Sequence, residues 1–137
     1  MRNARAARGV TLIELMVVVV IIGILASIGY PLYLDQVRKS RRAEAKSALQ
    51  EAMTREERLY TTTNTYAASM TTLGYANDPF TSSHGWYTVD GAACGGGGLG
   101  ECVKLTATAQ KDQAKDSCGD FTLDSRGSRA ADAAGCW

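Results

Sequence analysis

The stretch Gly9-Val10-Thr11-Leu12-Ile13-Glu14-Leu15 decides how this chain is organised, because it joins a basic leader to a long apolar segment. From Leu15 to Leu34 no residue carries a formal charge. About 20 apolar residues are enough to cross a bilayer as a helix, so this segment predicts a transmembrane helix. A charge within such a span costs about 2.5 to 3.5 kcal/mol. Glu14, at the head of the span, is therefore predicted to have a function.

The leader, residues 1–9, contains Arg2, Arg5 and Arg8 and no acidic residue. The positive-inside rule therefore favours a cytoplasmic position for it. A secretory signal would have an apolar core of about 7 to 15 residues, followed by a small-residue cleavage site. Here the apolar run is longer and a glycine precedes it. Cleavage after the run, at Ser27-Ile28-Gly29, is an alternative.

The segment from Gly9 to Leu15 resembles the class III signal of type IV prepilins. This resemblance implies that a prepilin peptidase, which is also an N-methyltransferase, cuts after Gly9 and methylates the new amino terminus at Val10. The family most often has phenylalanine at the position of Val10, which is the one departure. Gly23 and Pro31 fall where many type IV pilins have a helix-weakening glycine and proline. In filament assembly we expect Glu14 to pair with the positively charged amine of a neighbouring subunit, and the resemblance implies that Gly23 to Pro31 lose helical hydrogen bonds in the packed filament.

The carboxyl-terminal part of the chain carries the same resemblance. The segments Cys118-Gly119-Asp120-Phe121-Thr122-Leu123-Asp124 and Gly135-Cys136-Trp137 are similar to the tails of pilins, including minor pilins of the PilE type. The resemblance implies the type IV pilin fold, in which a long amino-terminal helix packs on a small antiparallel sheet. The predicted fold class is therefore α+β.

Hydrophobic periodicity divides the chain into four predicted parts. They are the leader 1–9, an apolar membrane or filament-core helix 10–34, an amphipathic helix 35–61 and a head 62–137. A helix from about Thr11 to about Tyr60 would be roughly 75 Å long. Pro31 lacks a backbone donor, which predicts a kink or a local opening of the helix near Ser27.

The head has strand patterns in three places. These are Trp86–Val89, the alternating segment Val103–Gln110 and Phe121–Leu123. They predict an antiparallel sheet with one apolar face on the helix and one threonine-rich face in water. A short helix is expected near Tyr66 to Leu73. The four consecutive glycines from Gly95 to Gly98 predict a flexible loop.

The four cysteines, Cys94, Cys102, Cys118 and Cys136, predict two disulfides, because a head of about 75 residues is small and needs covalent support. Three pairings are open. We favour pairing between nearest neighbours, which closes short loops worth about 2.5 to 3 kcal/mol each. No Cys-x-x-Cys pair is present, and His84 has a loop composition around it, so neither a metal site nor a cofactor is expected.

The formal charge of the chain is +1. Removing the leader arginines leaves 12 of the 15 basic side chains against 14 acidic ones, so a broad nucleic-acid-binding surface is not expected. We expect the one basic cluster to pair with acidic groups of neighbouring subunits or with lipid head groups, with DNA contact as an alternative. The cluster is Arg38, Lys39, Arg41 and Arg42.

Acidic residues recur every four positions late in the chain, and we expect them to be solvated. They are Asp112, Asp116, Asp120 and Asp124. They form no group typical of an active site with a nucleophile and a base, so no catalytic residue is predicted and an enzyme is not expected.

The resemblance implies a structural function, as a subunit of a type IV pilus, with the minor subunit favoured over the major one. Adhesion, twitching motility and DNA uptake remain open. The implied partners are other pilin subunits, the prepilin peptidase and the inner-membrane assembly machinery. The protein would lie in the bacterial inner membrane with its amino terminus in the cytoplasm, and then in an extracellular filament. Alternatives are a pseudopilin of a type II secretion system and a membrane-anchored binding domain that never polymerises.

Overall fold

The structure, a computed structural model, describes residues 9–137, so Arg2, Arg5 and Arg8 lie outside the described residues. Contacts divide the chain into two compact units, Met1–Gln36 and Val37–Trp137. The helices are α1 (Leu12–Thr63) and the 3-10 helices η1 (Met70–Leu73) and η2 (Lys111–Lys115). The strands are β1 (Phe80–Thr81), β2 (Tyr87–Ala93), β3 (Val103–Ala109), β4 (Phe121–Asp124) and β5 (Arg129–Ala131).

The first unit consists of the apolar half of α1. The helix begins at Leu12, and the hydroxyl of Thr11 accepts a hydrogen bond from the backbone N–H of Glu14 at 3.3 Å, as at a helix N-cap. The large apolar side chains that follow are exposed, from 48% for Val18 to 78% for Leu12. By length and composition this helix can cross a membrane, with a mean hydropathy of 2.7 in its most apolar window.

The helix α1 continues through Pro31 without a break. The predicted opening near Ser27 is therefore wrong for the single chain. Proline removes one N–H donor, but its fixed φ suits a helix, and the bonds on either side of the gap can hold the backbone. Ser27 meanwhile donates its hydroxyl to the carbonyl of Ile24 at 2.7 Å.

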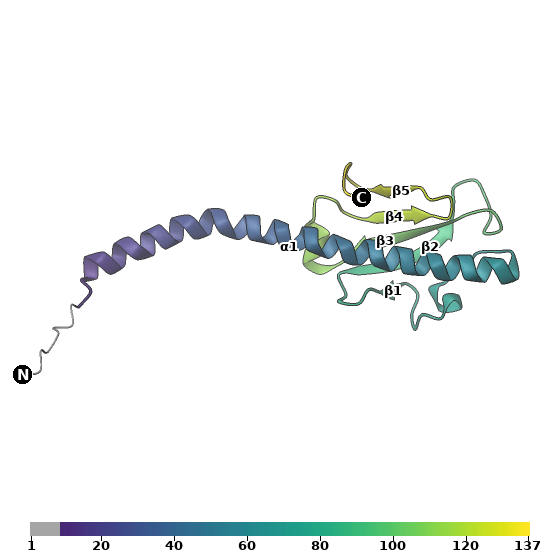
Figure 1. The fold of residues 1–137 in the computed structure, drawn as a ribbon, viewed down its shortest axis with the longest axis horizontal. Helices are drawn as coiled ribbons and strands as arrows, with labels where there is room; N and C mark the ends of the chain where they lie inside the picture. The colour runs from purple at the N-terminus through teal and green to yellow at the C-terminus, as the bar shows by residue number, and fades with distance from the viewer. Residues whose placement is uncertain (1–8) are drawn as a thin grey trace, which may run out of the picture. The chain divides into compact units, whose positions relative to one another are not determined.

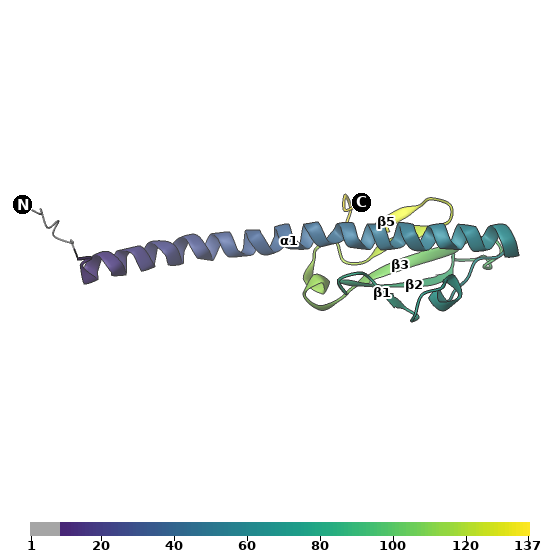
Figure 2. The same ribbon diagram turned by 60° about the horizontal axis from the view of Figure 1, so that its bottom comes forward.

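In the second unit, five strands form one antiparallel sheet in the order β1-β2-β3-β4-β5. The second half of α1 lies across one face of this sheet (Figures 1 and 2). The helix buries a stripe rich in small residues, which lets its backbone approach the strands closely. The stripe is Ala45, Ala48, Leu49, Ala52, Met53 and Glu56.

The inward side chains of the strands complete the core. Tyr87 on β2, Leu105 on β3 and Phe121 on β4 are fully buried. The alternate residues of β3, such as Thr106 and Thr108, point to the other face and are less buried, as the period of two requires. The predicted fold, a long helix on a small antiparallel sheet, is confirmed.

The sequence patterns missed β1 and β5, the two edge strands. These strands are only two and three residues long, and they are defined by pairing, Phe80 with Val89 and Leu123 with Arg129, more than by any pattern of their own. Trp86 precedes β2, which extends further than predicted, to Ala93. Only the end of the short helix expected near Tyr66 to Leu73 is present, as η1.

Disulfides join Cys94 to Cys102 and Cys118 to Cys136, with Cα–Cα distances of 5.4 and 5.8 Å. This is the nearest-neighbour pairing. A carboxylate oxygen of Asp124 lies within 4.8 Å of the first pair of sulfur atoms, but sulfurs joined in a disulfide are not thiolates and make no metal site.

The carboxyl-terminal segment, residues 132–137, is hydrogen-bonded to the chain near the start of β4 and to β5. The N–H of Asp132 donates to the carbonyl of Cys118 at 3.2 Å, and the indole N–H of Trp137 donates to the carbonyl of Ala130 at 2.5 Å. Gly119 makes this return compatible with the backbone, because its φ is 55° and a Cβ there would lie 2.0 Å from a carboxylate oxygen of Asp132.

Glu56 is a fully buried acidic residue in this core. One of its carboxylate oxygens accepts the N–H of Ala67 at 2.9 Å, which fastens the segment after α1 to the helix. Burial raises the pKa of Glu56, and the hydrogen bond from Ala67 opposes this only partly. The residue therefore favours its protonated form more than an exposed glutamate does.

Candidate functional site

The residues predicted to act in processing and assembly all lie in the first unit. Gly9 and Val10 precede α1, and Val10 is 70% exposed. Glu14 lies in the first turn of the helix, with Gly23 and Pro31 further along it. Among the described residues, Glu14 has no ion-pair partner, so a cation for it would have to come from elsewhere.

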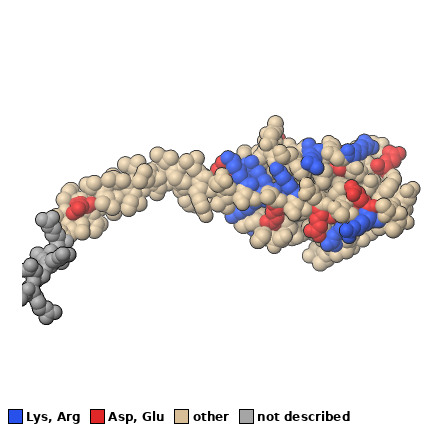
Figure 3. Space-filling view, viewed as in Figure 1, with Lys and Arg blue, Asp and Glu red and all other residues tan. Residues whose placement is uncertain are grey.

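The surface around Glu14 is apolar, and Figure 3 shows this half of the molecule almost wholly in the colour of uncharged residues. A Cβ added at Gly23 would meet no atom of residues 9–137 within 4 Å. Nothing in the single chain therefore requires a glycine at this position. An apolar surface of this extent marks a site of contact with lipid or with other chains.

Three of the four residues of the basic cluster, Arg38, Arg41 and Arg42, have partners within their own head, whereas the sequence predicted partners on neighbouring subunits or lipid head groups. Arg42 forms a bidentate ion pair with Asp116, in which Nε lies 2.8 Å from one carboxylate oxygen and a terminal nitrogen lies 2.6 Å from the other. Arg38 reaches Asp112 at 3.2 Å, and the guanidinium of Arg41 lies 3.5 Å from the ring centroid of Trp86.

The prediction that the late aspartates are solvated is wrong for Asp116, whose side chain is 0% exposed. Asp120 is also engaged, since it accepts the N–H of Ala109 at 2.8 Å, and Asp124 accepts N–H groups of the β4–β5 turn. Asp112 is more open, and its hydrogen bond from Arg38 is the main reason that its pKa is lowered.

A signal for these pairs was present in the sequence. Arg38 and Arg42 are four residues apart, and so are Asp112 and Asp116, and the partners of each pair are 74 positions apart in the sequence. Equal spacing on two segments permits two parallel ion pairs when the segments lie side by side. The sequence does not say that η2 lies beside α1.

His84 lies in the turn before β2 and is 76% exposed at its side chain. Its backbone N–H donates to one oxygen of Glu44 at 2.9 Å, and its Nδ1 lies 3.1 Å from the other. His84 is therefore an exposed loop residue, as expected, but the sequence did not predict its contacts with Glu44.

Comparison with known proteins connects these features to a family. A family described as "Type IV minor pilin ComP, DNA uptake sequence receptor" matches residues 31–122. The family "Prokaryotic N-terminal methylation motif" matches residues 4–30, which include Gly9 and Glu14. The chain belongs to the type IV minor pilin ComP family. This pilin family is structural and non-enzymatic.

Individual relatives agree with this assignment. The type IV major pilin protein PilA of Myxococcus xanthus (strain DK1622) is 37% identical over 86 residues, which are 63% of this chain and 38% of that protein. The fimbrial protein EcpC of Eikenella corrodens is 58% identical over 38 residues, 28% of this chain and 25% of that protein. The pilin thus aligns with well under half the length of these curated relatives.

A solved type IV pilin from Shewanella oneidensis has the same fold. It superposes with a TM-score of 0.54 and 27% sequence identity, covering 73% of this chain and 97% of that one. The type IV pilin fold predicted from the resemblance is therefore confirmed.

Proposed function

We propose that this pilin is a minor structural subunit of a type IV pilus, cut after Gly9 and methylated at Val10 before assembly. The observation that carries this proposal is the exposed apolar half of α1 with Glu14 as its one charged residue between residues 9 and 34. The partners would be other pilin subunits, the prepilin peptidase/N-methyltransferase and the inner-membrane assembly machinery. The subunit would first reside in the inner membrane with its amino terminus in the cytoplasm.

We propose that an ion pair between neighbouring subunits sets their axial register in the filament. Cleavage after Gly9 creates a positively charged amine on Val10, and Glu14 of one subunit would pair with the amine of the next. Each charge is costly alone in an apolar filament core, and the pair is tolerated. Subunits related by a rotation and a rise that never close form an open helical fibre.

The stretch from Gly23 to Pro31 would adapt the helix to the filament. In the single chain it is helical throughout. Glycine has low helix propensity and proline lacks a donor, so we expect the helix to open more easily in this stretch than elsewhere in α1. We propose that it loses helical bonds when subunits pack and lets the filament extend under tension.

Mass spectrometry of sheared pili tests the processing and assembly proposal. We expect the mature amino-terminal peptide to begin at N-methylated Val10, and the chain to be present at low abundance relative to the major pilin. Cells lacking the prepilin peptidase are the control and should keep residues 1–9. Sheared pili that contain the chain with its leader intact would contradict the proposal. Absence of the chain from pili, with presence in a secretion complex, would favour the pseudopilin.

We further propose DNA uptake as the use of this pilus, because the matched family is described as a DNA uptake sequence receptor. Several basic side chains on the head are near aromatic rings or exposed. Lys46 lies 5.6 Å and Arg129 5.4 Å from the ring of Trp137, and Arg126 in the next turn is exposed. Figure 3 shows basic residues over α1 and along the edge of the sheet, with acidic residues between them. We call Lys46, Arg126 and Arg129 the edge cations.

The salt dependence of DNA binding by the full-length pilin in detergent micelles tests this second proposal. We expect the edge cations to contact three phosphates. A plot of the logarithm of the association constant against the logarithm of the salt concentration should then have a slope of about −2.7. The Arg126→Ala substitution should reduce this slope by about one. Arg58→Ala, which removes an exposed cation elsewhere on α1, is the matched control. An unchanged slope in Arg126→Ala would exclude this contact.

A further inference from the structure

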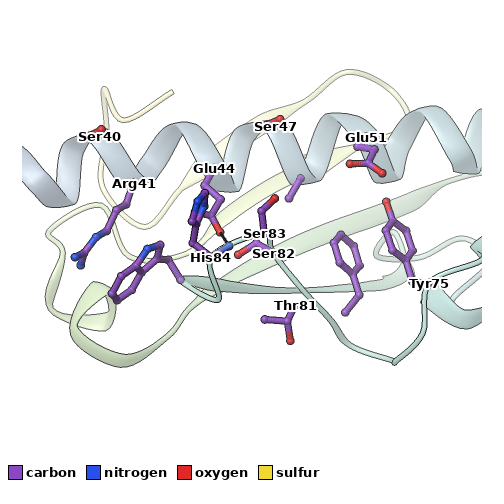
Figure 4. A pocket seen from close by; sticks show the side chains of 13 residues that line it. Ser40, Arg41, Glu44, Ser47, Glu51, Tyr75, Thr81, Ser82, Ser83 and His84 are labelled. Carbon is purple, nitrogen blue, oxygen red and sulfur yellow. Dashed lines mark hydrogen bonds and ion pairs between the residues drawn. The ribbon is translucent and has the colours of Figure 1, made fainter.

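The head contains a groove of about 640 Å³ between α1 and the segment that leads from β1 into β2. This volume lies within the range of pockets that hold drug-sized ligands. Neither proposed function uses the groove. Exposed residues with hydroxyl groups are among those that line the groove, and Figure 4 labels them on α1 and below it. They are Ser40 and Ser47 on α1 and Thr81 and Ser83 on the other side.

Glu44 is a fixed hydrogen-bond acceptor in the middle of this groove. Its side chain is 14% exposed and is held by the backbone and the ring of His84. Burial acts to raise the pKa of Glu44, but hydrogen bonds from Ser82 and His84 outweigh it, so the pKa lies below its ordinary value. The carboxylate is therefore ionised at neutral pH, and its oxygens can accept further bonds.

Tyr75 provides a donor at the other end. Its hydroxyl is shielded from solvent and lies near the carboxylate of Glu51, but it makes no hydrogen bond of good geometry within residues 9–137. Its ring stacks on Phe80 with the centroids 3.8 Å apart. Burial raises the pKa of Tyr75, and the charge of Glu51 raises it further, so the phenol stays protonated. A shielded hydroxyl whose nearby acceptor is poorly aligned is costly, which favours a ligand that supplies a better acceptor.

The charged side chains that line the groove make some classes of ligand unfavourable. Glu44 and Glu51 line the groove together with one cation, Arg41, which lies over the ring of Trp86. Glu51 is also paired with Arg55 at 2.9 Å, so two carboxylates are balanced by two guanidinium groups and no net charge attracts phosphate groups or other anions. A cationic peptide is attracted by the carboxylates but repelled by Arg41, and its ammonium groups cannot accept the bond offered by Tyr75.

We propose that this groove binds a neutral oligosaccharide. Sugar hydroxyls both donate and accept, so they match the carboxylate of Glu44, the phenol of Tyr75 and the serine and threonine hydroxyls. The C–H faces of sugar rings are apolar and suit the aromatic lining. A short chain of sugars, unlike a single ion, would extend from the Trp86 end to the Tyr75 end.

Chemical-shift mapping of the full-length pilin in detergent micelles tests the groove, independently of pilus assembly and DNA binding. The probes are lactose, maltotriose and cellotriose, with sialyllactose as an anionic sugar and trilysine as a cationic peptide. We expect at least one neutral sugar to shift the amides of Tyr75 and of residues 81–86 in a saturable way, and sialyllactose to bind more weakly than lactose. No saturable shift with the three neutral sugars, or shifts with trilysine alone, would overturn the proposal.

Two substitutions separate binding from folding. Ser47→Trp places a large side chain in the groove from an exposed helix position and should abolish the shifts, whereas Gln50→Trp, exposed on α1 outside the groove, should not. Tyr75→Phe should weaken sugar binding roughly threefold to tenfold without lowering the melting temperature, because it removes a shielded hydroxyl that makes no hydrogen bond of good geometry. Equal binding by Tyr75→Phe and the unmodified pilin would overturn the assigned role of that hydroxyl.

Discussion

Pilin carrying Glu14→Ala is expected to be almost absent from pili while remaining in the membrane. The substitution leaves the Val10 amine of the neighbouring subunit without a counter-charge in an apolar filament core. Removing one partner of a buried ion pair costs about 3 to 5 kcal/mol, which is a loss of about a hundredfold or more in an association constant. Quantitative immunoblotting of sheared pili and of membranes measures the effect.

Two further substitutions show whether charge is the cause. Glu14→Gln keeps the shape and the hydrogen-bonding capacity of the side chain, so we expect it to assemble better than Glu14→Ala and worse than the unmodified pilin. Glu57→Ala removes a carboxylate from an exposed position on the second half of α1 and should assemble normally. Normal incorporation of Glu14→Ala would remove the charge-pairing argument.

Loss of the Arg42–Asp116 ion pair should be the most damaging single change in the head. The pair is two-pronged, with 15% of the arginine and none of the aspartate side chain exposed. In Arg42→Met the carboxylate of Asp116 stays buried without its guanidinium, so the free energy of unfolding should fall by about 3 to 5 kcal/mol. Denaturant unfolding of the full-length pilin in micelles, followed by the near-ultraviolet signal of its tryptophans, measures this fall.

The neighbouring pair supplies the control for that experiment. Arg38 bonds Asp112, whose side chain is 41% exposed, so Asp112→Ala should lower the free energy of unfolding far less than Arg42→Met does. The double substitution Arg42→Met with Asp116→Leu removes both buried charges and should recover most of the stability lost in Arg42→Met. A similar loss in Asp112→Ala and Arg42→Met would show that burial does not distinguish the two pairs.

The hydrophobic periodicity of the sequence was sufficient to predict α1 and β3, because these elements depend on residues that are close together along the chain. The apolar run after Glu14 and the helical spacing beyond it predicted α1 within three residues at either end. Alternation predicted the strand at 103–110, one residue longer than β3, Val103–Ala109, because one face of that strand is buried and the other is not. The edge strands β1 and β5 were missed, because their neighbours define them.

The sequence by itself determined that Glu14 heads an apolar helix, that the chain carries a prepilin signal and that a small antiparallel head follows, since each depends on residues close together along the chain. Only the tertiary structure decided that Asp116 is buried against Arg42 and that Arg38 and Arg41 also find partners within their own head. It alone decided that Glu44 and Tyr75 line the same groove. These outcomes depend on which distant segments lie side by side. That placement follows from the packing of α1 on the whole sheet, and no single stretch of sequence encodes it.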